Sequence, residues 1–493
     1  MATHKTLAQL GLAAASGQEA RITGLSVDSR QVAPGHLFAA LPGTRVHGAE
    51  FVPYALRMEA AAILTDAEGA RIAADALARS SAALVVTEDP RGALAGAAAL
   101  WFGAQPETVV AVTGTNGKTS VASFARQIWQ ALGEAAVSLG TMGVEGDWEA
   151  PLAHTTPEPI TLHRTLAEAA AAGITHAAME ASSHGLAQRR LDGVRLAAAG
   201  FTNITQDHLD YHADFEDYFA AKARLFTRVL GEEGVAVVNT DGANGPRMAD
   251  LAEARGHEVL RVGRSERCQL RLTALRFEPT GQEMRFSWNG RTHQARLALI
   301  GGFQAENVLV AAGLAIGAGA DPEEVFAALP RLSGVRGRMQ LAATRENGAA
   351  VFVDYAHTPD ALATALRALR PHVMGRIVCV FGAGGDRDRG KRPLMGAAVA
   401  EHADIAFVTD DNPRGEEPGA IRAEILAACA EGVEVGDRAE AILRGVDALG
   451  PGDALLIAGK GHETGQVVGD VTYPFDDAEQ ASVAVAALDG RVS

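Results

Sequence analysis

The sequence predicts an α/β protein built from three domains. The chain has 493 residues, which corresponds to about three domains at roughly 100–200 residues each. Short β-branched and apolar runs alternate with alanine-rich helical stretches, the pattern of parallel sheets that are covered by helices. A glycine-rich loop joins one such run to the helix that follows it. The hydrophobic fraction of 47% and the charged fraction of 21% are those of a globular protein and exclude a disordered chain.

Net charge and cysteine content exclude several classes of protein. The formal net charge is −16, from 44 basic and 60 acidic residues, so the chain is a poor binder of polyanions and we expect no nucleic-acid partner. The three cysteines lie far apart and form no CxxC pair, which argues against a disulfide framework and a cysteine zinc site. Cys379 lies in an apolar run and is predicted to be a core residue. No signal peptide is recognisable and no run reaches the ~18 apolar residues of a membrane span. We therefore expect a cytoplasmic protein.

The first domain is predicted over residues 1–88. Short strands are expected at Ala61–Leu64 and Ala83–Val86, between turns rich in glycine and proline. A helical stretch from Asp89 to Pro106 ends at a proline before a new strand, which marks the boundary.

The second domain is predicted over residues 89–332. It begins with the β-branched run Thr108–Thr113, followed by a glycine loop and a helix over Ser120–Leu132. Further elements are buried strands at Ile174–Met179 and Val235–Val238, an antiparallel pair at Leu270–Phe277 and Met284–Trp288, and a helix at Ala305–Gly317.

The third domain is predicted over residues 333–493, as a second parallel sheet with right-handed crossovers. Its strands are expected at Ala350–Val353, Ile377–Phe381, Ile405–Thr409 and Ala454–Ile457. Ligands bind beyond the carboxyl ends of such strands. Polar clusters follow each of them, at Asp354–Pro359, Gly382–Arg392, Thr409–Arg414 and Gly459–Glu463.

The segment Gly114–Thr119, Gly-Thr-Asn-Gly-Lys-Thr, is the strongest single chemical signal. Its glycines let backbone N–H groups turn toward phosphate oxygens. Lys118 can reach the β- and γ-phosphates of a nucleotide, and Thr119 can offer its hydroxyl to Mg²⁺. The full P-loop pattern would place its first glycine at Val112, so a shorter loop is implied. The predicted ATP-binding residues of this loop are Gly114, Thr115, Asn116, Gly117, Lys118, Thr119 and Ser120.

Three further polar segments each admit two interpretations. Glu180 ends a predicted strand and could hold Mg²⁺, although a solvated carboxylate is the simpler interpretation. Thr205–His212 contains two histidines and two aspartates; the spacing matches no standard zinc site and oxygen ligands favour Mg²⁺. A polar helix start capped by Asp207 or Asp210 competes with that metal site. Lys222 lies in an amphipathic helical pattern and, taken alone, is predicted to lie on the surface.

Taken together, these segments resemble the Mur ligases. The resemblance runs from Asp28–Arg30 to Gly459–Glu463, nearly the whole chain, and its motifs occur in family order. They are Gly114–Thr119, His154–Pro157, Glu180–Gly185, Asp207–His212, Lys222, Asp354–Pro359, Asp411–Arg414 and Gly459–Glu463. The resemblance implies a first domain that binds a uridine nucleotide, a central P-loop-type parallel-sheet ATPase, and a C-terminal Rossmann-like domain for an incoming amino acid. It also implies ATP and Mg²⁺ as the required cosubstrate and metal.

The resemblance assigns roles to individual residues. Lys118, Lys222, His208 and Glu180 would be catalytic, and Lys222 would carry a carbamate that binds Mg²⁺. The other metal ligands would be Thr119, Glu180 and His208. The substrate UDP-N-acetylmuramoyl-L-alanyl-D-glutamate would be held by Ser29, Thr44, Arg45, Val46, Thr155, Thr156, Ser182, Gln188 and Arg190. The base and ribose of ATP would contact Asn307, Arg338 and His357.

The segment Asp411–Arg414 bears on the choice of amino acid. In the family it implies selection of meso-diaminopimelate, which has a second carboxylate where lysine has only an ammonium. Arg414 can bind that carboxylate through two parallel donors and would repel the lysine ammonium. Arg387 would be the second carboxylate partner, with Arg389 as an alternative. The remaining predicted contacts are Asp411, Asn412, Pro413, Gly459 and Glu463. A turn closed by Pro413 is the simpler interpretation of the same segment.

The implied reaction is an ATP-dependent ligation that serves peptidoglycan synthesis. ATP would phosphorylate the substrate's glutamate side chain, and the amine of meso-diaminopimelate would displace phosphate from the acyl phosphate. We expect a monomer. One alternative is the related folylpolyglutamate synthetase branch, against which Asp28–Arg30 and Asp411–Arg414 argue. Another is a non-catalytic nucleotide-binding protein, against which the presence of Lys118, Glu180 and Lys222 argues.

Overall fold

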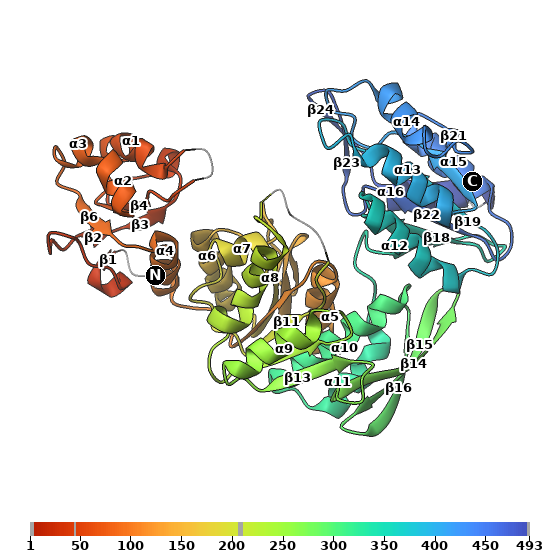
Figure 1. Cartoon of the computed structure of the whole chain (residues 1–493), viewed down its shortest axis with the longest axis horizontal. Coiled ribbons are helices and arrows are strands. Elements are labelled where there is room, and N and C mark those ends of the chain that lie inside the picture. The colour runs from red at the N-terminus through yellow and green to blue at the C-terminus, as the bar shows by residue number, and fades with distance from the viewer. Residues whose placement is uncertain (1–3, 44–45, 206–210, 491–493) are drawn as a thin grey trace. The chain divides into compact units, whose positions relative to one another are not determined.

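The computed structural model describes residues 4–43, 46–205 and 211–490 of the chain (Figure 1). The chain divides into two compact units, Met1–Val262 with Val310–Asp321 and Gly263–Leu309 with Pro322–Ser493, and each is considered by itself. Strands alternate with helices in both units, which confirms the α/β class. Among the described residues, no helix combines the length and the apolar character needed to cross a membrane.

The first sheet of unit one has four parallel strands in the order β3-β4-β5-β6. Leu37 and Leu64 pack on one face with Leu94 of the following helix, whereas Phe38 packs on the other face with Val52. Successive residues of a strand therefore point to opposite faces of the sheet, and both faces are covered by apolar cores. Because of this, each strand appears in the sequence as a short continuous apolar run. The elements are β3 (Gly24–Ser26), β4 (His36–Ala39), β5 (Ala62–Thr65), β6 (Ala83–Val86), α1 (Val52–Arg57), α2 (Ala67–Ile72), α3 (Ala74–Leu77) and α4 (Pro90–Phe102), preceded by an antiparallel pair, β1 (Lys5–Thr6) and β2 (Arg21–Ile22).

The strands of the second sheet that belong to unit one have the order β13-β12-β11-β7-β10-β8-β9. All neighbours are parallel except β8 and β9. The first strand in sequence, β7, lies between β10 and β11, so connections leave it toward both sides and a crevice opens at its carboxyl end. The elements are β7 (Thr108–Thr113), β8 (Ala136–Gly140), β9 (Gly143–Gly146), β10 (His176–Glu180), β11 (Ala198–Phe201), β12 (Val235–Asn239), β13 (Val259–Gly263), α5 (Lys118–Ala131), α6 (Pro159–Ala171), α7 (Ser183–Ala187), α8 (Phe215–Arg224) and α9 (Gly245–Ala254).

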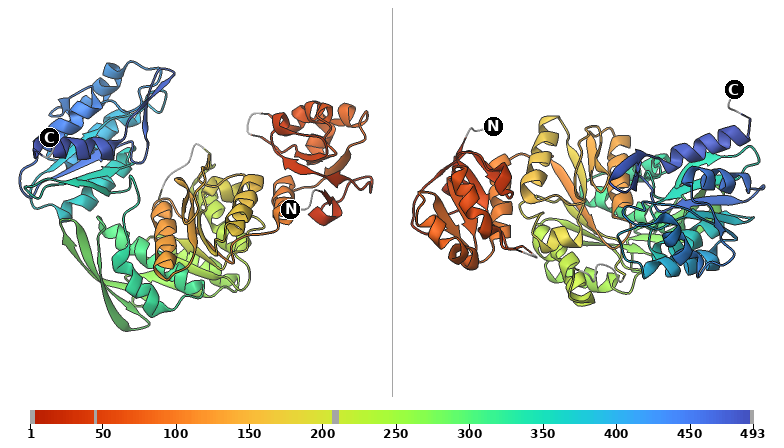
Figure 2. Two further views of the ribbon diagram at one scale, coloured as in Figure 1. Left: turned by 180° about the vertical axis from the view of Figure 1, so that it is seen from behind. Right: turned by 90° about the horizontal axis from the view of Figure 1, so that it is seen from above.

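Unit two begins with a long, twisted antiparallel ribbon, drawn in green in Figures 1 and 2. Its strands are β14 (Leu270–Glu278), β15 (Gly281–Trp288) and β16 (Arg291–Leu297). The helices α10 (Gly302–Gly317), of which residues 302–309 belong to this unit, and α11 (Pro322–Ala328) follow. The antiparallel arrangement predicted from alternating residues is confirmed. The side chain of His372 joins this ribbon to the next sheet, since its ring contacts Glu278 O at 2.7 Å and Gly301 N at 2.9 Å.

The sheet of unit two has the order β17-β18-β22-β19-β20-β21, parallel except for the edge pair β17 and β18. Helices cover both of its faces: α12, α13 and α14 pack on one, α15 and α16 on the other (Figure 1). Cys379 is fully buried in this core, as predicted. The elements are β17 (Gln340–Thr344), β18 (Ala350–Asp354), β19 (Ile377–Phe381), β20 (Ile405–Val408), β21 (Val433–Glu434), β22 (Ala454–Ala458), α12 (Pro359–Leu369), α13 (Lys391–His402), α14 (Pro418–Leu426), α15 (Arg438–Asp447) and α16 (Asp477–Leu488), with a hairpin of β23 (Gly465–Val468) and β24 (Val471–Pro474).

Candidate active site

The glycine loop lies between β7 and α5 and is held in shape by the chain that follows β11. Gly114 and Gly117 have φ values of +155° and +90°, and a Cβ on Gly114 would lie 1.9 Å from Thr202 Oγ1. Thr202 Oγ1 donates to Asn116 O at 2.6 Å, and Asn203 Oδ1 accepts from Asn116 N at 3.0 Å. Hydrogen bonds within the chain therefore hold the loop in shape, at the crevice beyond the central strand.

Two lysine side chains converge on the carbonyl of Gly114. Lys118 Nζ donates to Gly114 O and to Thr115 O, both at 2.9 Å, and Lys222 Nζ donates to Gly114 O at 2.7 Å. Lys222 also lies 4.5 Å from the ring centroid of Tyr218. Because the Lys222 residue is only 1% exposed, the prediction of a surface lysine is wrong. The amphipathic pattern around Lys222 predicts a helix, but it does not show that this side chain contacts Gly114, which lies 108 positions earlier in the chain.

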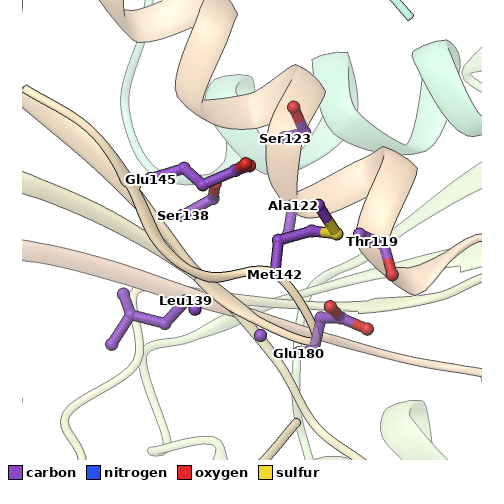
Figure 3. A pocket seen from close by; sticks show the side chains of 10 residues that line it. Thr119, Ala122, Ser123, Ser138, Leu139, Met142, Glu145 and Glu180 are labelled. Atoms are coloured by element: carbon purple, nitrogen blue, oxygen red, sulfur yellow. The ribbon is translucent and has the colours of Figure 1, made fainter. Parts of the chain in front are cut away.

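Glu180 ends β10 beside the same loop and is only 2% exposed, so the interpretation as a solvated carboxylate is also wrong. Its Oε1 atom accepts from Thr141 N at 2.8 Å. A Cβ on Gly140 would lie 2.0 Å from that oxygen, so a glycine is needed to admit the carboxylate. Thr119, at the start of α5, lines the same small pocket as Glu180 (Figure 3).

These residues fit a magnesium ion better than a zinc ion. The described residues contain no group of three or more His, Cys, Asp or Glu side chains that could hold a metal. The pocket instead brings together the hydroxyl of Thr119 and the carboxylate of Glu180, which are oxygen ligands of the type Mg²⁺ takes alongside substrate phosphates. His208, the fourth predicted ligand, lies outside the described residues.

Behind Glu180, a chain of hydrogen bonds positions the residues predicted to hold the muramoyl peptide. Thr156 Oγ1 donates to Glu180 O at 2.9 Å and accepts from Ser182 N at 3.0 Å. Arg190 NH1 donates to Thr156 O at 2.6 Å, and its NH2 donates to Gln188 Oε1 at 2.8 Å. The Arg190 and Gln188 side chains thereby line a cavity of about 170 Å³. The other lining residues are Val27, Leu41, Arg91, Leu94, Glu158 and Pro159.

That cavity is suited to an anionic ligand. Burial lowers the pKa of Arg190, and the nearby positive charge of Arg91 lowers it further. Glu158, in the same lining, offsets part of the Arg91 effect, and the carboxylate or phosphate groups of a ligand would compensate the two guanidinium charges further. Arg91 was not predicted as a site residue, since it lies in the first turn of a helix and belongs to no recognisable sequence motif.

The other residues predicted for this substrate that the structure describes do not line that cavity. Thr155 Oγ1 contacts Thr141 Oγ1 at 3.0 Å, near Glu180. Ser182 Oγ caps α7 by accepting from Gly185 N. Ser29 begins a short turn after Asp28 and is half-buried, and Val46 is exposed. Thr44 and Arg45 lie outside the described residues.

In unit two, the predicted amino-acid residues lie in the loops after β19, β20 and β22. Asn412 is 5% exposed, and its amide is engaged at both ends. Nδ2 donates to Glu463 Oε2 at 2.9 Å, while Oδ1 accepts from Lys460 Nζ at 3.0 Å and from Val467 N at 2.9 Å. Asn412 thus orients Glu463, and a direct contact with an amino acid remains a prediction. Lys460 is fully buried and was missed, although it lies inside the motif Gly459–Glu463.

Arg414 leaves the same loop with a left-handed backbone, φ +50°. Its NH1 donates to Gly385 O at 2.9 Å, and its backbone N donates to Val467 O at 3.0 Å. Arg387 is exposed on the neighbouring loop. Asp411, 8% exposed, comes close to Gly459, where a Cβ would lie 2.5 Å from Asp411 Oδ2. Pro413 is buried between Asn412 and Arg414.

Two of the three residues predicted for the ATP base and ribose surround Tyr355. Arg338 places its guanidinium 4.8 Å from the Tyr355 ring centroid, and His357 Nδ1 contacts Tyr355 O at 2.8 Å. Asn307, 6% exposed, lies on α10, where its Nδ2 donates to Gln304 Oε1 at 3.0 Å. All three belong to unit two. Their contact with one nucleotide remains a prediction.

Comparison with protein families gives matches along most of the chain. Residues 21–101 match the catalytic domain of the Mur ligase family, residues 112–315 match the Mur ligase middle domain, and residues 337–461 match the Mur ligase glutamate ligase domain.

Curated relatives match over nearly their whole length. The UDP-N-acetylmuramoyl-L-alanyl-D-glutamate–2,6-diaminopimelate ligase of Bradyrhizobium diazoefficiens is 50% identical over 471 residues, which is 94% of this chain and 95% of that protein. The protein of the same name from Caulobacter vibrioides is 50% identical, over 95% of this chain and 96% of its own. A solved structure of a ligase with this name is 33% identical, with a TM-score of 0.71, and covers 95% of each chain. MurF from Acinetobacter baumannii, at 18% identity and a TM-score of 0.61 over 92% of this chain and 96% of its own, shares the fold.

Proposed function

The chain belongs to the Mur ligase family, and from this premise we propose that it adds meso-diaminopimelate to UDP-N-acetylmuramoyl-L-alanyl-D-glutamate. It is an ATP-dependent, amide-forming ligase of peptidoglycan precursor synthesis. Relatives that are 50% identical over nearly their whole length carry this activity in their names.

The observation that carries the choice of amino acid is the arrangement around Arg414. The guanidinium is anchored on one side by Gly385 O, and a guanidinium has five N–H donors, so donors remain for a carboxylate. In the loops after β20 and β22, Asn412 and Lys460 hold one oxygen of Glu463. An arginine and an oriented carboxylate match the carboxylate and the ammonium at the distal end of meso-diaminopimelate. L-Lysine would bring only an ammonium to these groups.

The residues near Gly114 supply the chemistry of phosphoryl transfer. The glutamate carboxylate of the substrate attacks the γ-phosphorus of ATP, which gives an acyl phosphate and ADP. The amine of meso-diaminopimelate, as its free base, then attacks the acyl carbon; the bond from that carbon to the phosphate oxygen breaks, inorganic phosphate leaves and the new amide nitrogen loses a proton. Lys118 neutralises negative charge on the transferring phosphoryl group, and the loop amides hold the phosphate oxygens, so that catalysis is mainly positioning and electrostatics.

Mg²⁺ fits the oxygen-rich side of this site. Thr119, Glu180, His208 and a carbamate on Lys222 would hold it. When bound, it offsets the charge of the ATP phosphates. Glu180 is already oriented for this role by Thr141 N.

Phosphate release from ATP tests the assignment directly. The purified chain is given ATP, Mg²⁺ and UDP-N-acetylmuramoyl-L-alanyl-D-glutamate, with meso-diaminopimelate or L-lysine as the amine. We expect phosphate release with meso-diaminopimelate and little with L-lysine, because a bare ammonium faces Arg414. Release with L-lysine alone would keep the ligase but reject the selectivity. A reaction that requires a folate and glutamate would instead assign the chain to the folylpolyglutamate branch.

Glu180→Gln tests the metal assignment. Glutamine can still accept from Thr141 N but removes the negative charge. We expect kcat to fall by about 10²–10³-fold, as for the loss of one placed charge at a reaction centre. The Mg²⁺ concentration for half-maximal activity should rise about tenfold or more. Glu145→Gln, in the same pocket (Figure 3), is the matched control. An equal shift of the Mg²⁺ requirement in both variants would show that the pocket's overall charge, not Glu180, governs the metal.

A further inference from the structure

Two loops of unit two carry the arginines predicted to bind the distal carboxylate. We name residues 384–388 the Arg387 loop and residues 411–416 the Arg414 loop. A Cβ placed on Gly384 would lie 2.8 Å from Arg414 NH1 and 3.9 Å from Arg387 Cγ. The Arg414 guanidinium and the stem of the Arg387 side chain therefore both pass Gly384, although they come from different loops.

The two loops are joined by hydrogen bonds from backbone N–H groups in both directions, one to a carbonyl and one to a side-chain carboxylate. Gly385 N donates to Asn412 O at 2.9 Å, and Gly415 N donates to Asp386 Oδ2 at 3.0 Å. Asp386 and Arg414 both have left-handed backbones, with φ values of +54° and +50°. Residues other than glycine rarely adopt this conformation and keep it only when the surroundings impose it. Each loop therefore depends on contacts outside itself for its shape.

Glu416 makes the contact that reaches both loops. It belongs to the Arg414 loop, and its Oε1 atom accepts from Asp386 N of the Arg387 loop at 2.6 Å. The same carboxylate is bound by Arg392 of α13, whose NH2 donates to Oε1 at 2.7 Å and whose NH1 donates to Oε2 at 3.0 Å. This two-point contact lowers the pKa of Glu416 to about 2, so the carboxylate is ionised at neutral pH. Arg392 has no exposed surface.

Arg392 is in turn fixed by a second helix, since its NH1 also donates to Glu424 Oε2 of α14 at 3.0 Å. Bidentate arginine–carboxylate contacts fix direction as well as distance. Arg392 thus fixes the position of the Glu416 carboxylate relative to both α13 and α14. Neither Arg392 nor Glu416 is predicted to touch a substrate.

We propose that Arg392 and Glu416 are positioning residues for amino-acid selection, which hold the Arg387 loop and the Arg414 loop in register so that both arginines face one carboxylate. This inference rests on the proposed function, because it presumes that meso-diaminopimelate is the amine. Loss of the contact lets the loops separate, which weakens binding of the distal carboxylate and displaces the Arg414 charge that rejects lysine. The nucleotide and the muramoyl substrate are unaffected.

Glu416→Gln is the first test variant, since it keeps the side-chain length and an acceptor for Asp386 N but loses the ion pair. Arg392→Lys is the second, since it keeps the charge but loses the two-point geometry. For Glu416→Gln we expect the KM for meso-diaminopimelate to rise about tenfold or more, the size of a lost charge-assisted hydrogen bond. The KM values for ATP and for the muramoyl substrate should stay unchanged, and the preference for meso-diaminopimelate over L-lysine should fall. Arg392→Lys should lie between this variant and the wild type.

Asp453→Asn is the matched control for stability. Asp453 is a buried carboxylate that, like Glu416, binds an arginine and joins two loops: it accepts from Arg376 N, from the Arg376 guanidinium and from Gly450 N. It lies at the amino ends of β19 and β22, away from both arginine loops. Asp453→Asn should lower the thermal unfolding temperature without changing either the KM for meso-diaminopimelate or the preference over L-lysine.

The outcomes separate the inference from the proposed function. A wild-type chain that does not release phosphate with meso-diaminopimelate refutes the proposed function, and the inference with it. A wild type that uses meso-diaminopimelate, with Glu416→Gln or Arg392→Lys variants that unfold at lower temperature but keep its KM and selectivity, refutes the positioning role alone. A rise in the KM for meso-diaminopimelate in the folded variants, absent in Asp453→Asn, supports it.

Discussion

Replacing Lys222 by methionine is expected to lower kcat by about 10²–10³-fold or more, the size of a placed charge at a phosphoryl-transfer centre. Lys222 is 1% exposed, and its Nζ lies 2.7 Å from Gly114 O. A carbamate formed on that nitrogen would place a carboxylate-like group beside the phosphate loop, where Mg²⁺ is proposed to bind. Methionine keeps the apolar contacts of the side chain but cannot form the carbamate.

Lys222→Arg separates charge from carbamate chemistry. Arginine keeps a positive charge beside Gly114, but its guanidinium stays protonated and therefore does not react with CO₂ to form a carbamate. If the carbamate is required, both variants lose activity, and only the wild type gains activity when bicarbonate is added back to CO₂-depleted buffer. Lys5→Arg, in β1, should behave as the wild type. A Lys222→Arg variant with wild-type kcat and no bicarbonate response in any variant would reject the carbamate.

The second large effect is expected for Arg414→Leu. The kcat/KM for meso-diaminopimelate should fall about 10²-fold or more, because removing one partner of a buried charge pair typically costs ~2–5 kcal/mol. The activity with L-lysine should rise or stay constant, since the repulsive charge is gone. Steady-state phosphate release with each amine measures both quantities.

Arg414→Lys distinguishes charge from geometry at the same position. Lysine keeps a positive charge but lacks the planar fork that binds a carboxylate at two points. It should therefore still reject L-lysine while binding meso-diaminopimelate more weakly than the wild type. If both variants kept the wild-type preference for meso-diaminopimelate over L-lysine, Arg387 rather than Arg414 would be the residue that selects the amino acid.

The strands that the sequence predicts best are the β-branched ones. The runs Thr108–Thr113 and Ile377–Phe381 form β7 and β19 with the predicted bounds, because valine and isoleucine favour a pleated, buried surface. The strand β11, Ala198–Phe201, was missed although it lies between β7 and β12 in the middle of its sheet. Its sequence Ala-Ala-Gly-Phe has no β-branched residue, and alanine suits a helix as well. Burial from both faces, which a single segment does not reveal, decides its structure.

The candidate site shows a related limit. The glycine loop was predicted from its own residues, since each group needed to hold phosphate is local. Glu180 and Lys222 were assigned to the surface when considered alone, and both are buried. Their partners, Thr141 N and Gly114 O, lie 39 and 108 positions away. Resemblance to the Mur ligases marked both residues as functional, whereas periodicity identified only the helix and the strand that carry them.

Asn412 also bears on the chemical durability of the protein. Both ends of its amide are engaged, with Glu463 accepting from Nδ2 and Lys460 donating to Oδ1. Spontaneous deamidation would replace the donor by a second anionic oxygen facing Glu463 and would force that carboxylate away. The usual route to deamidation passes through a succinimide, which forms when the next backbone nitrogen gives up its hydrogen. The next residue is Pro413, whose nitrogen carries no hydrogen, so the asparagine on which this site depends is protected from ageing by its neighbour in the chain.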